Sequence, residues 1–269
     1  MAFNSASASR RALVQTTIPH DPGDWCVHRF GMLAEQIRRS GQKLDPEFDV
    51  VCQDYPADSS ERATLHQQLS DGYFGQVWLM APDLDNGPDQ DFFEALEAAV
   101  QAGTHLILAR DHTDLGSSLL KLHGQLQSVT RTQVFLRSSS DQPDLDEYVD
   151  AQCPGIQTPC VMTGQNGGVQ ICRKRAEHPL LDFQTLIPGH VVMPAHPHEG
   201  VILRTTPSQT VLLSSYSVRS GREQITAILD ETSSAGWVLH HSTFHHLADF
   251  NLDVTSGTPS FVLDTSSSQ

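Results

Sequence analysis

A strand–helix–strand unit stands out between Gln76 and Arg110, QVWLMAPDLDNGPDQDFFEALEAAVQAGTHLILAR. Its first part, Gln76–Ala81, is a near-continuous apolar run, which is typical of a parallel strand buried on both faces. Asp89–Gln101 follows with apolar residues at helical spacing, and Gly103 is placed to end that helix. His105–Arg110 is a second buried strand. This order of elements predicts a βαβ unit of a parallel sheet.

The same alternation continues toward the N-terminus. Arg11–Thr17 is predicted as the first strand and Phe48–Gln53 as the second, with a helix over Val27–Arg39 between them. Asp58 and Glu61 have the spacing of a capping box, which predicts a further helix before the third strand. The N-terminal part of the chain is therefore expected to wind helices around parallel strands.

The second half of the chain has a different pattern. A fifth strand is predicted at Gln133–Arg137, and residues 138–168, rich in Ser, Asp, Gln, Pro and Gly, are predicted to be a loop insertion. The short strands expected after it are Val169–Cys172, His190–Pro194, Val201–Arg204, Val211–Ser217, Glu223–Leu229 and Trp237–Ser242. Their close spacing predicts antiparallel additions to the same sheet.

The fold class predicted from these patterns is α/β, with a doubly wound, mostly parallel, flavodoxin-like sheet and antiparallel β additions in the C-terminal half. A single domain is expected over residues 11–264, between flexible tails at residues 1–10 and 265–269.

Composition narrows the classes of partner. The 269 residues include 17 basic and 32 acidic ones, for a net charge of −15, and such an acidic protein repels nucleic acid. No basic amphipathic helix, apolar run of about 20 residues or signal-peptide core is evident, so no membrane partner is expected. The five cysteines form no Cys-x-x-Cys pair and are interpreted as reduced thiols of a cytoplasmic protein.

Ligands of open parallel sheets bind beyond the carboxyl ends of the strands, and this rule selects a first set of candidate residues. They are His20, Asp21, Asp24 and His28 after the first strand, Asp83 and Asp85 after the third, and Asp111, His112 and Asp114 after the fourth. We predict catalytic roles for Asp111 and His112, and substrate binding for His20, Asp24, Asp83 and Asp114. Loop aspartates also cap helices and build turns, and that alternative stays open for Asp83, Asp85 and Asp114.

A second cluster is His196-Pro197-His198-Glu199-Gly200. His196 and His198 point to the same side of an extended backbone, and Glu199 adds a carboxylate. These three residues are predicted to hold a divalent metal, Zn, Fe or Mn. A surface turn with solvated histidines is the alternative.

A third cluster, His240 to His246, contains four of the chain's fourteen histidines and is followed by Asp249 and Asn251. It begins at the end of the last predicted strand, where His245 and Asp249 would lie one helical turn apart. His245 and His246 are predicted to be catalytic, and Asp249 and Asn251 to bind substrate.

The order of elements resembles the class I glutamine-amidotransferase-like superfamily. Working members carry a nucleophilic cysteine at the turn after the fourth strand, where this chain has Arg110-Asp111-His112, so the resemblance implies a protein that is not an amidotransferase. His178-Pro179-Leu180, and Gly236-Trp237-Val238 leading to His245, resemble the ThuA-like, trehalose-utilisation-type branch. That branch is linked to sugar metabolism, which implies a small, sugar-derived substrate.

Three functional hypotheses follow. The first is a hydrolase or lyase that acts on a small polar molecule through its His, Asp and Glu side chains, with or without a metal. The second is a non-catalytic ligand-binding or regulatory module. The third is an acyl-transfer enzyme that uses Ser117 or Ser118, although no Gly-x-Ser-x-Gly elbow surrounds them. A homodimer is a further option, because folds of this kind often pair.

Overall fold

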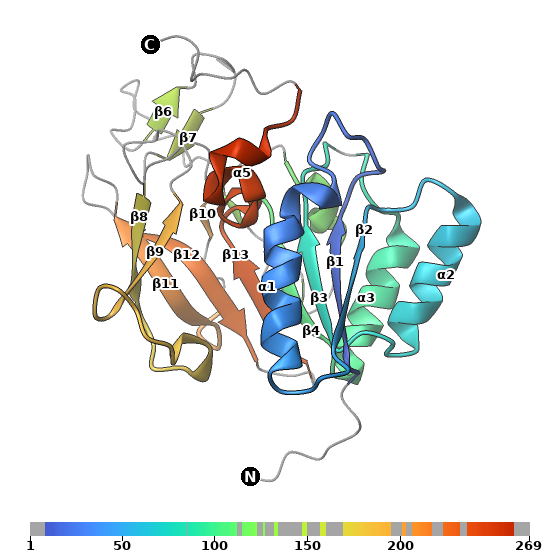
Figure 1. Cartoon of the computed structure of the whole chain (residues 1–269), viewed down its shortest axis with the longest axis horizontal. Helices are drawn as coiled ribbons and strands as arrows, with labels where there is room; N and C mark the ends of the chain where they lie inside the picture. The colour runs from blue at the N-terminus through green and yellow to red at the C-terminus, as the bar shows by residue number, and fades with distance from the viewer. Residues whose placement is uncertain are drawn as a thin grey trace.

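The computed structural model describes most of the N-terminal half and the C-terminal strands. The described residues are 9–84, 86–111, 115–122, 126, 132–133, 147–149, 157–159, 169–194, 201–202, 206–216, 223–231 and 236–260. They form an α/β structure around a large mixed sheet (Figure 1). Of the predicted terminal tails, residues 1–8 and 265–269 lie outside the described part, as do residues 261–264 of the predicted domain.

The N-terminal half supplies four mutually parallel strands, which are β1 (Arg11–Thr16), β2 (Asp49–Gln53), β3 (Gln76–Met80) and β4 (His105–Ala109). Their order is β2-β1-β3-β4. The next strand in space is β13 (Val238–His241), which pairs parallel with β4 although it comes about 130 residues later in the chain. Five neighbouring strands therefore end at one edge of the sheet, called here the carboxyl edge.

The helices of this half begin and end where local chemistry dictates. α1 (Gly31–Gln42) follows a 3-10 turn, η1 (Val27–Phe30). α2 (Ser59–Ser70) starts at Asp58, whose carboxylate accepts hydrogen bonds from two backbone N–H groups as the predicted cap requires. α3 (Gln90–Ala102) is capped by Asp89 and ends at Gly103, whose φ of 119° suits glycine.

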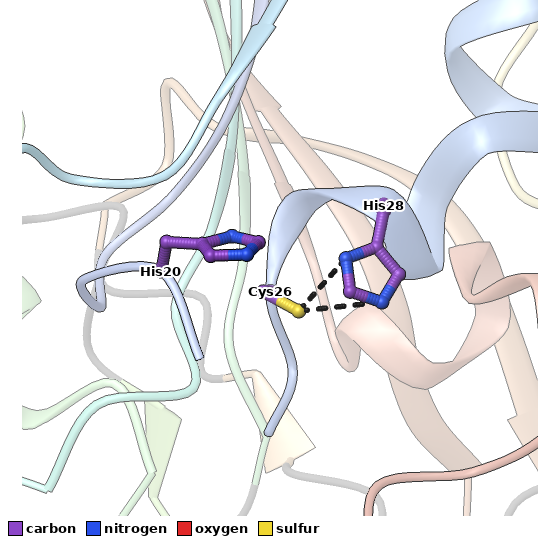
Figure 2. Close-up of side chains that lie close together, drawn as sticks. All are labelled: His20, Cys26 and His28. Carbon is purple, nitrogen blue, oxygen red and sulfur yellow. Dashed lines mark hydrogen bonds between the residues drawn. The ribbon is translucent and has the colours of Figure 1, made fainter. Parts of the chain in front are cut away.

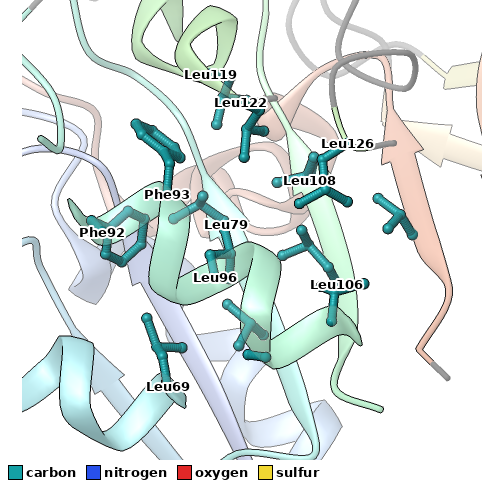
Figure 3. Packing of buried hydrophobic residues seen from close by; sticks show 14 of the residues in the cluster. Leu69, Leu79, Phe92, Phe93, Leu96, Leu106, Leu108, Leu119, Leu122 and Leu126 are labelled. Atoms are coloured by element: carbon teal, nitrogen blue, oxygen red, sulfur yellow. The ribbon is translucent and has the colours of Figure 1, made fainter. Parts of the chain in front are cut away.

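Alternate residues of the parallel strands feed two apolar clusters. Leu13 and Leu79 pack with α2 and α3, in the cluster drawn in Figure 3. Val14 and Met80 point the other way and pack with α1 and with Phe244. Because side chains of a strand alternate between faces, the two clusters lie on opposite faces of the sheet. Both faces are thus apolar, as the sequence of the buried strands predicts.

The C-terminal half extends the sheet beyond β13. Its strands are β8 (Val169–Lys174), β9 (His190–Pro194), β10 (Val201–Ile202), β11 (Thr210–Tyr216) and β12 (Glu223–Asp230). The order continues β13-β12-β11-β8-β9 with antiparallel pairing throughout, which confirms the predicted antiparallel additions. It follows that β8 begins, and β9 ends, at the carboxyl edge.

Two predictions concern the middle of the chain, and one of them needs correction. Of the fifth predicted strand, Gln133–Arg137, only Gln133 is described, and it lies in β5 (Thr132–Gln133), which pairs antiparallel with β10. β13 takes the place beside β4, because pairing across the sheet depends on long-range packing and not on chain order. The predicted loop insertion also contains two paired strands, β6 (Glu147–Val149) and β7 (Gln157–Pro159).

Short helical turns complete the carboxyl edge. They are η2 (Ser117–Lys121), η4 (Phe244–Leu247), α5 (Asp249–Leu252) and η5 (Val254–Ser256), and η3 (Pro179–Leu181) lies at the opposite edge, after β8. None of the described helices combines the length and the apolarity needed to cross a bilayer.

Candidate functional site

Asp111 and His245 meet at the carboxyl edge. Asp111 follows β4, and His245 lies in η4 just after β13, the parallel neighbour of β4. His245 Nε2 lies 3.3 Å from Asp111 Oδ2, with the carboxylate fully buried and the imidazole 6% exposed. Two residues far apart in the sequence therefore form a buried carboxylate–imidazole pair, at the place where the strand-end rule put them.

Neighbouring groups fix the position of His245. Thr243 caps η4 by accepting a hydrogen bond from the His245 backbone N–H at 3.0 Å. Asn251 Nδ2 donates to the His245 carbonyl at 2.8 Å, so this predicted substrate-binding side chain contacts backbone. The Trp25 indole packs edge-on against the imidazole with ring centroids 4.6 Å apart. The His245 backbone is thus held at both its N–H and its carbonyl, and its ring packs against Trp25, so the side chain keeps one orientation toward Asp111.

His246 belongs to a separate chain of buried hydrogen bonds. Its Nδ1 lies 2.8 Å from His241 Nε2, and its Nε2 lies 3.0 Å from Gln170 Oε1 on β8. Gln170 in turn donates to Ser215 Oγ on β11 at 2.9 Å. The chain crosses several strands of the sheet and has no exposed member. His246 therefore links the last helical turns to the antiparallel half, while its predicted catalytic role stays a prediction.

Burial makes these two histidines resist protonation. It lowers the pKa of His241 from 6.5 to about 4. It also lowers the pKa of His246 well below 6.5, with smaller contributions from His241 and His245, while Asp111 acts in the opposite direction. Both imidazoles are therefore neutral at physiological pH.

We expect the free energy of unfolding to decrease as the pH falls from about 6.5 to 4. In this pH window His241 and His246 bind protons in the unfolded chain but stay neutral in the native protein. Above the window they are neutral in both states. A pKa of about 4 for His241 corresponds to a loss of about 3 kcal/mol across the window. Urea unfolding from pH 7.5 to 4.5 measures it. His246→Gln should reduce the slope of the free energy of unfolding against pH by the equivalent of about one proton. An unchanged slope would contradict the lowered pKa of His246.

Asp24, Asp83 and Asp249, all predicted to bind substrate, make contacts within the protein. Asp249 accepts hydrogen bonds from the N–H groups of Gly31 and Met32 at 2.9 Å each, which caps α1, and burial raises its pKa. Asp24 accepts from the Trp25 N–H at 2.6 Å. Their predicted role in substrate binding stays untested, but each has a clear function in the fold.

Asp83 is fully buried just after β3, and its carboxylate links Thr17 and Ser118 through hydrogen bonds that are called here the Asp83 staple. Its Oδ2 accepts from Thr17 Oγ1 at 2.6 Å and from Ser118 Oγ at 2.7 Å, and its Oδ1 accepts from the Ser118 N–H at 2.9 Å. Ser117 Oγ lies 3.4 Å from the same oxygen. Ser118 thus faces a carboxylate and is fully buried, which gives no support to its use as a nucleophile.

His20 lies beside a residue that the sequence analysis did not select, Asp54. His20 Nδ1 is 2.7 Å from Asp54 Oδ2, and the other carboxylate oxygen accepts from Thr16 Oγ1 and the Val27 N–H at 2.6 Å each. His20 is exposed while Asp54 is nearly buried. Asp54 directly follows β2, so the strand-end rule would have identified it had it been applied to the second strand as well.

A cleft of about 810 Å³ opens next to this second pair. Among its lining residues are His20, Gln53, Asp54, Tyr55 and Asp58, from the carboxyl ends of β1 and β2 and the start of α2. Neither Asp111 nor His245 lines it. Another cleft, of about 590 Å³, lies at the opposite edge around His178-Pro179, where the His178 imidazole caps η3. That motif is thus separated from the carboxyl edge.

Cys26 is buried next to His28. Its Sγ lies 3.1 Å from His28 Nδ1 and 3.6 Å from His28 Nε2. Burial, followed by the charge of Asp54, raises the pKa of the thiol. Cys26 is therefore not an activated nucleophile of the kind that cysteine hydrolases use.

The remaining predicted site residues lie outside the described part of the chain. They are the catalytic candidate His112, the substrate-binding candidate Asp114, and the three predicted metal ligands His196, His198 and Glu199. Asp85 also lies outside it. Pro194, the last described residue before the predicted metal cluster, ends β9 at the carboxyl edge.

No family model matches the sequence, and no curated protein matches it. The function proposed for this protein is therefore derived from its own residues.

Proposed function

We propose that the protein is an enzyme, a hydrolase or lyase, that acts on a small polar and sugar-derived molecule through general acid/base catalysis by Asp111 and His245. The observation that carries the proposal is the 3.3 Å contact between His245 Nε2 and Asp111 Oδ2 at the carboxyl ends of two adjacent parallel strands. Open parallel sheets bind their ligands at this place.

The pair has the composition that proton transfer requires. A buried carboxylate orients the imidazole through one ring nitrogen and stabilises the imidazolium that forms when the ring accepts a proton. The second nitrogen, Nδ1, is buried, so in this proposal it exchanges a proton only with a substrate or water molecule that reaches the protein interior at this point. Hydrolysis and elimination both need such a group. Glutamine amidotransfer is excluded from the proposal because Arg110-Asp111-His112 offers no thiol at this turn.

We further propose a doubly wound, amidotransferase-like fold of the ThuA-like type. Support comes from the parallel order β2-β1-β3-β4-β13 and from apolar packing on both faces of these strands. A divalent metal at His196, His198 and Glu199 belongs to the same proposal, because β9 ends at the carboxyl edge immediately before them.

Substitution of the pair tests the proposal. On a panel of sugar lactones, sugar esters and sugar acids, we expect Asp111→Asn and His245→Gln each to lower kcat/KM by about 10²- to 10⁴-fold, the usual contribution of a general acid or base. His190, a half-buried histidine at the opposite edge, provides the matched control, and His190→Gln should keep full activity. Near-ultraviolet circular dichroism checks that the variants are folded. Undiminished turnover by both variants would refute the catalytic role.

A ligand-binding or regulatory module is the second candidate function. The observation in its favour is the exposed apolar surface of β8 and β9, where Ile171 and Val192 are directly paired and both exposed. A second copy of the chain would cover such a surface. Sedimentation of wild type and Ile171→Lys separates the cases: a dimer lost in the variant, together with no turnover by either protein, would favour this function.

A further inference from the structure

The loop after β1 brings three metal-binding side chains together. His20, Cys26 and His28 each offer a ligand atom, and these atoms all lie within 4.8 Å of one another. Figure 2 shows the Cys26 sulfur between the two imidazoles. Among the described residues, no other group of three or more His, Cys, Asp or Glu side chains is gathered this closely. The spacing of the ligands in the sequence, six residues and then two, is a consequence of the loop's fold and follows no common zinc motif.

The distances suit a tetrahedral ion. Zinc binds thiolate at about 2.3 Å and imidazole at about 2.0 Å, which places sulfur and nitrogen about 3.5 Å apart across a tetrahedral centre. Cys26 Sγ lies 3.6 Å from His28 Nε2, which is close to this value, and 3.1 Å from His28 Nδ1. The ring centroids of His20 and His28 are 5.9 Å apart, and both side chains are exposed, so small rotations can close the remaining gap.

Asp54 provides the outer-sphere contact that metal-binding histidines commonly have. With His20 Nδ1 donating to Asp54 Oδ2 at 2.7 Å, the tautomer is fixed and Nε2 is left as the ligand atom. Asp54 is itself anchored by Thr16 and by the Val27 backbone. A nearly buried, anchored carboxylate that orients an exposed imidazole is an observation independent of the cluster itself.

We propose that His20, Cys26 and His28 form a zinc site with one coordination position left for water or for a ligand in the adjoining cleft. One thiolate and two imidazoles favour zinc among the common divalent ions, and three protein ligands leave a tetrahedral ion one position open. His20 belongs both to the cluster and to the lining of the 810 Å³ cleft, so a small molecule held there could reach the ion.

The zinc site does not depend on catalysis by Asp111 and His245. Trp25 joins the two regions, because it precedes Cys26 in the chain and packs against the His245 ring. The site is also distinct from the metal cluster predicted at His196, His198 and Glu199. Separate variants can therefore test the three assignments.

Cobalt titration of the full-length, tag-free, reduced protein is the decisive experiment. Co²⁺ reports a bound thiolate through a sulfur-to-metal charge-transfer band, and Zn²⁺ should displace it at one equivalent. Cys26→Ser should abolish the band, whereas Cys52→Ser, which removes an exposed thiol on β2, should leave it unchanged. A band that survives in Cys26→Ser, or no band in the wild type, would overturn the proposal.

Variants at the exposed histidines keep the test valid if Cys26→Ser does not fold. Each of His20→Gln and His28→Gln should weaken Zn²⁺ binding by about 10- to 100-fold or more, since each removes a direct ligand. The double variant His196→Gln/His198→Gln should bind at this site with unchanged affinity. If only the double variant loses zinc, the ion belongs to the other cluster, and the site proposed for His20, Cys26 and His28 is wrong.

Discussion

Replacing Asp83 with alanine is expected to destabilise the protein by about 3 to 5 kcal/mol. The substitution removes a fully buried acceptor and leaves the Thr17 hydroxyl, the Ser118 hydroxyl and the Ser118 N–H without their acceptor. Each buried donor left in this way costs about 1 to 3 kcal/mol. Hydrogen bonds to a carboxylate are also stronger than neutral ones. Urea unfolding at pH 7.5 measures the loss.

Asp83→Asn is the matched comparison, because it keeps the shape of the side chain and one acceptor oxygen. The hydroxyls of Thr17 and Ser118 can rotate to accept from the new amide, so a smaller loss of about 1 to 2 kcal/mol is expected. Asp58→Ala is a second comparison, since it removes an exposed helix cap at a cost of about 1 kcal/mol. If Asp83→Ala lowers the free energy of unfolding no more than Asp58→Ala does, the hydrogen bonds accepted by Asp83 do not have the proposed stabilising role.

The staple matters for function because of what it connects. Asp83 lies three residues after β3, Thr17 directly follows the neighbouring β1, and Ser118 lies in η2, after the turn that carries Asp111. The Asp83 carbonyl also accepts a hydrogen bond from the Gly116 N–H at 2.7 Å. An aspartate selected from the sequence as a substrate-binding candidate thus holds the backbone that follows the proposed catalytic turn, at Gly116 and Ser118. Asp83 therefore has the structural role, in turns and helix caps, that loop aspartates commonly have.

Local sequence patterns predict where the helices and strands of this fold lie, but they do not predict which strands lie side by side in the sheet. The apolar run at Gln76–Ala81, the cap at Asp58 and the glycine at Gly103 act within a few residues, and the corresponding strand and helices form where expected. The place of β13 beside β4 depends on packing between segments about 130 residues apart. No short-range pattern records that contact, so the sequence does not predict that β13 pairs with β4.

The candidate sites likewise include one contact that the sequence predicts and one cluster that only the folded chain brings together. The strand-end rule needs only the ends of strands, so it anticipates that Asp111 and His245 lie at one edge. Cys-x-x-Cys spacing takes no account of histidine partners, so by that criterion Cys26 is only a reduced thiol. Its neighbours His20 and His28 were each named as candidates, but only the folded loop brings all three together with Asp54.

Gly236 is the second position at which a single substitution should have a large effect. A methyl group there would overlap the carbonyl oxygen of Thr104 and lie 2.9 Å from the carbonyl oxygen of Val100. Both obstacles are backbone atoms. Thr104 is buried and donates its hydroxyl to the Phe74 carbonyl at 2.8 Å, so it cannot easily move aside. We expect Gly236→Ala to destabilise the protein by about 3 kcal/mol or more, through strain of the kind that overpacking causes.

The comparison for Gly236→Ala is Gly72→Ala. Gly72 has a φ of 68°, and a methyl group added there meets nothing within 4 Å, so it should cost only about 1 kcal/mol of backbone strain. Thermal and urea unfolding of both variants separate close packing from backbone conformation. The Gly236 N–H also donates to the Val100 carbonyl at 3.0 Å, which ties the start of β13 to the end of α3. Because β13 leads directly to His245, a strained Gly236 variant that still folds should also misplace the imidazole relative to Asp111. Equal stability of the two variants would show that the chain can relax at this junction, and the close approach would then not be the reason for a glycine in the Gly236-Trp237-Val238 motif.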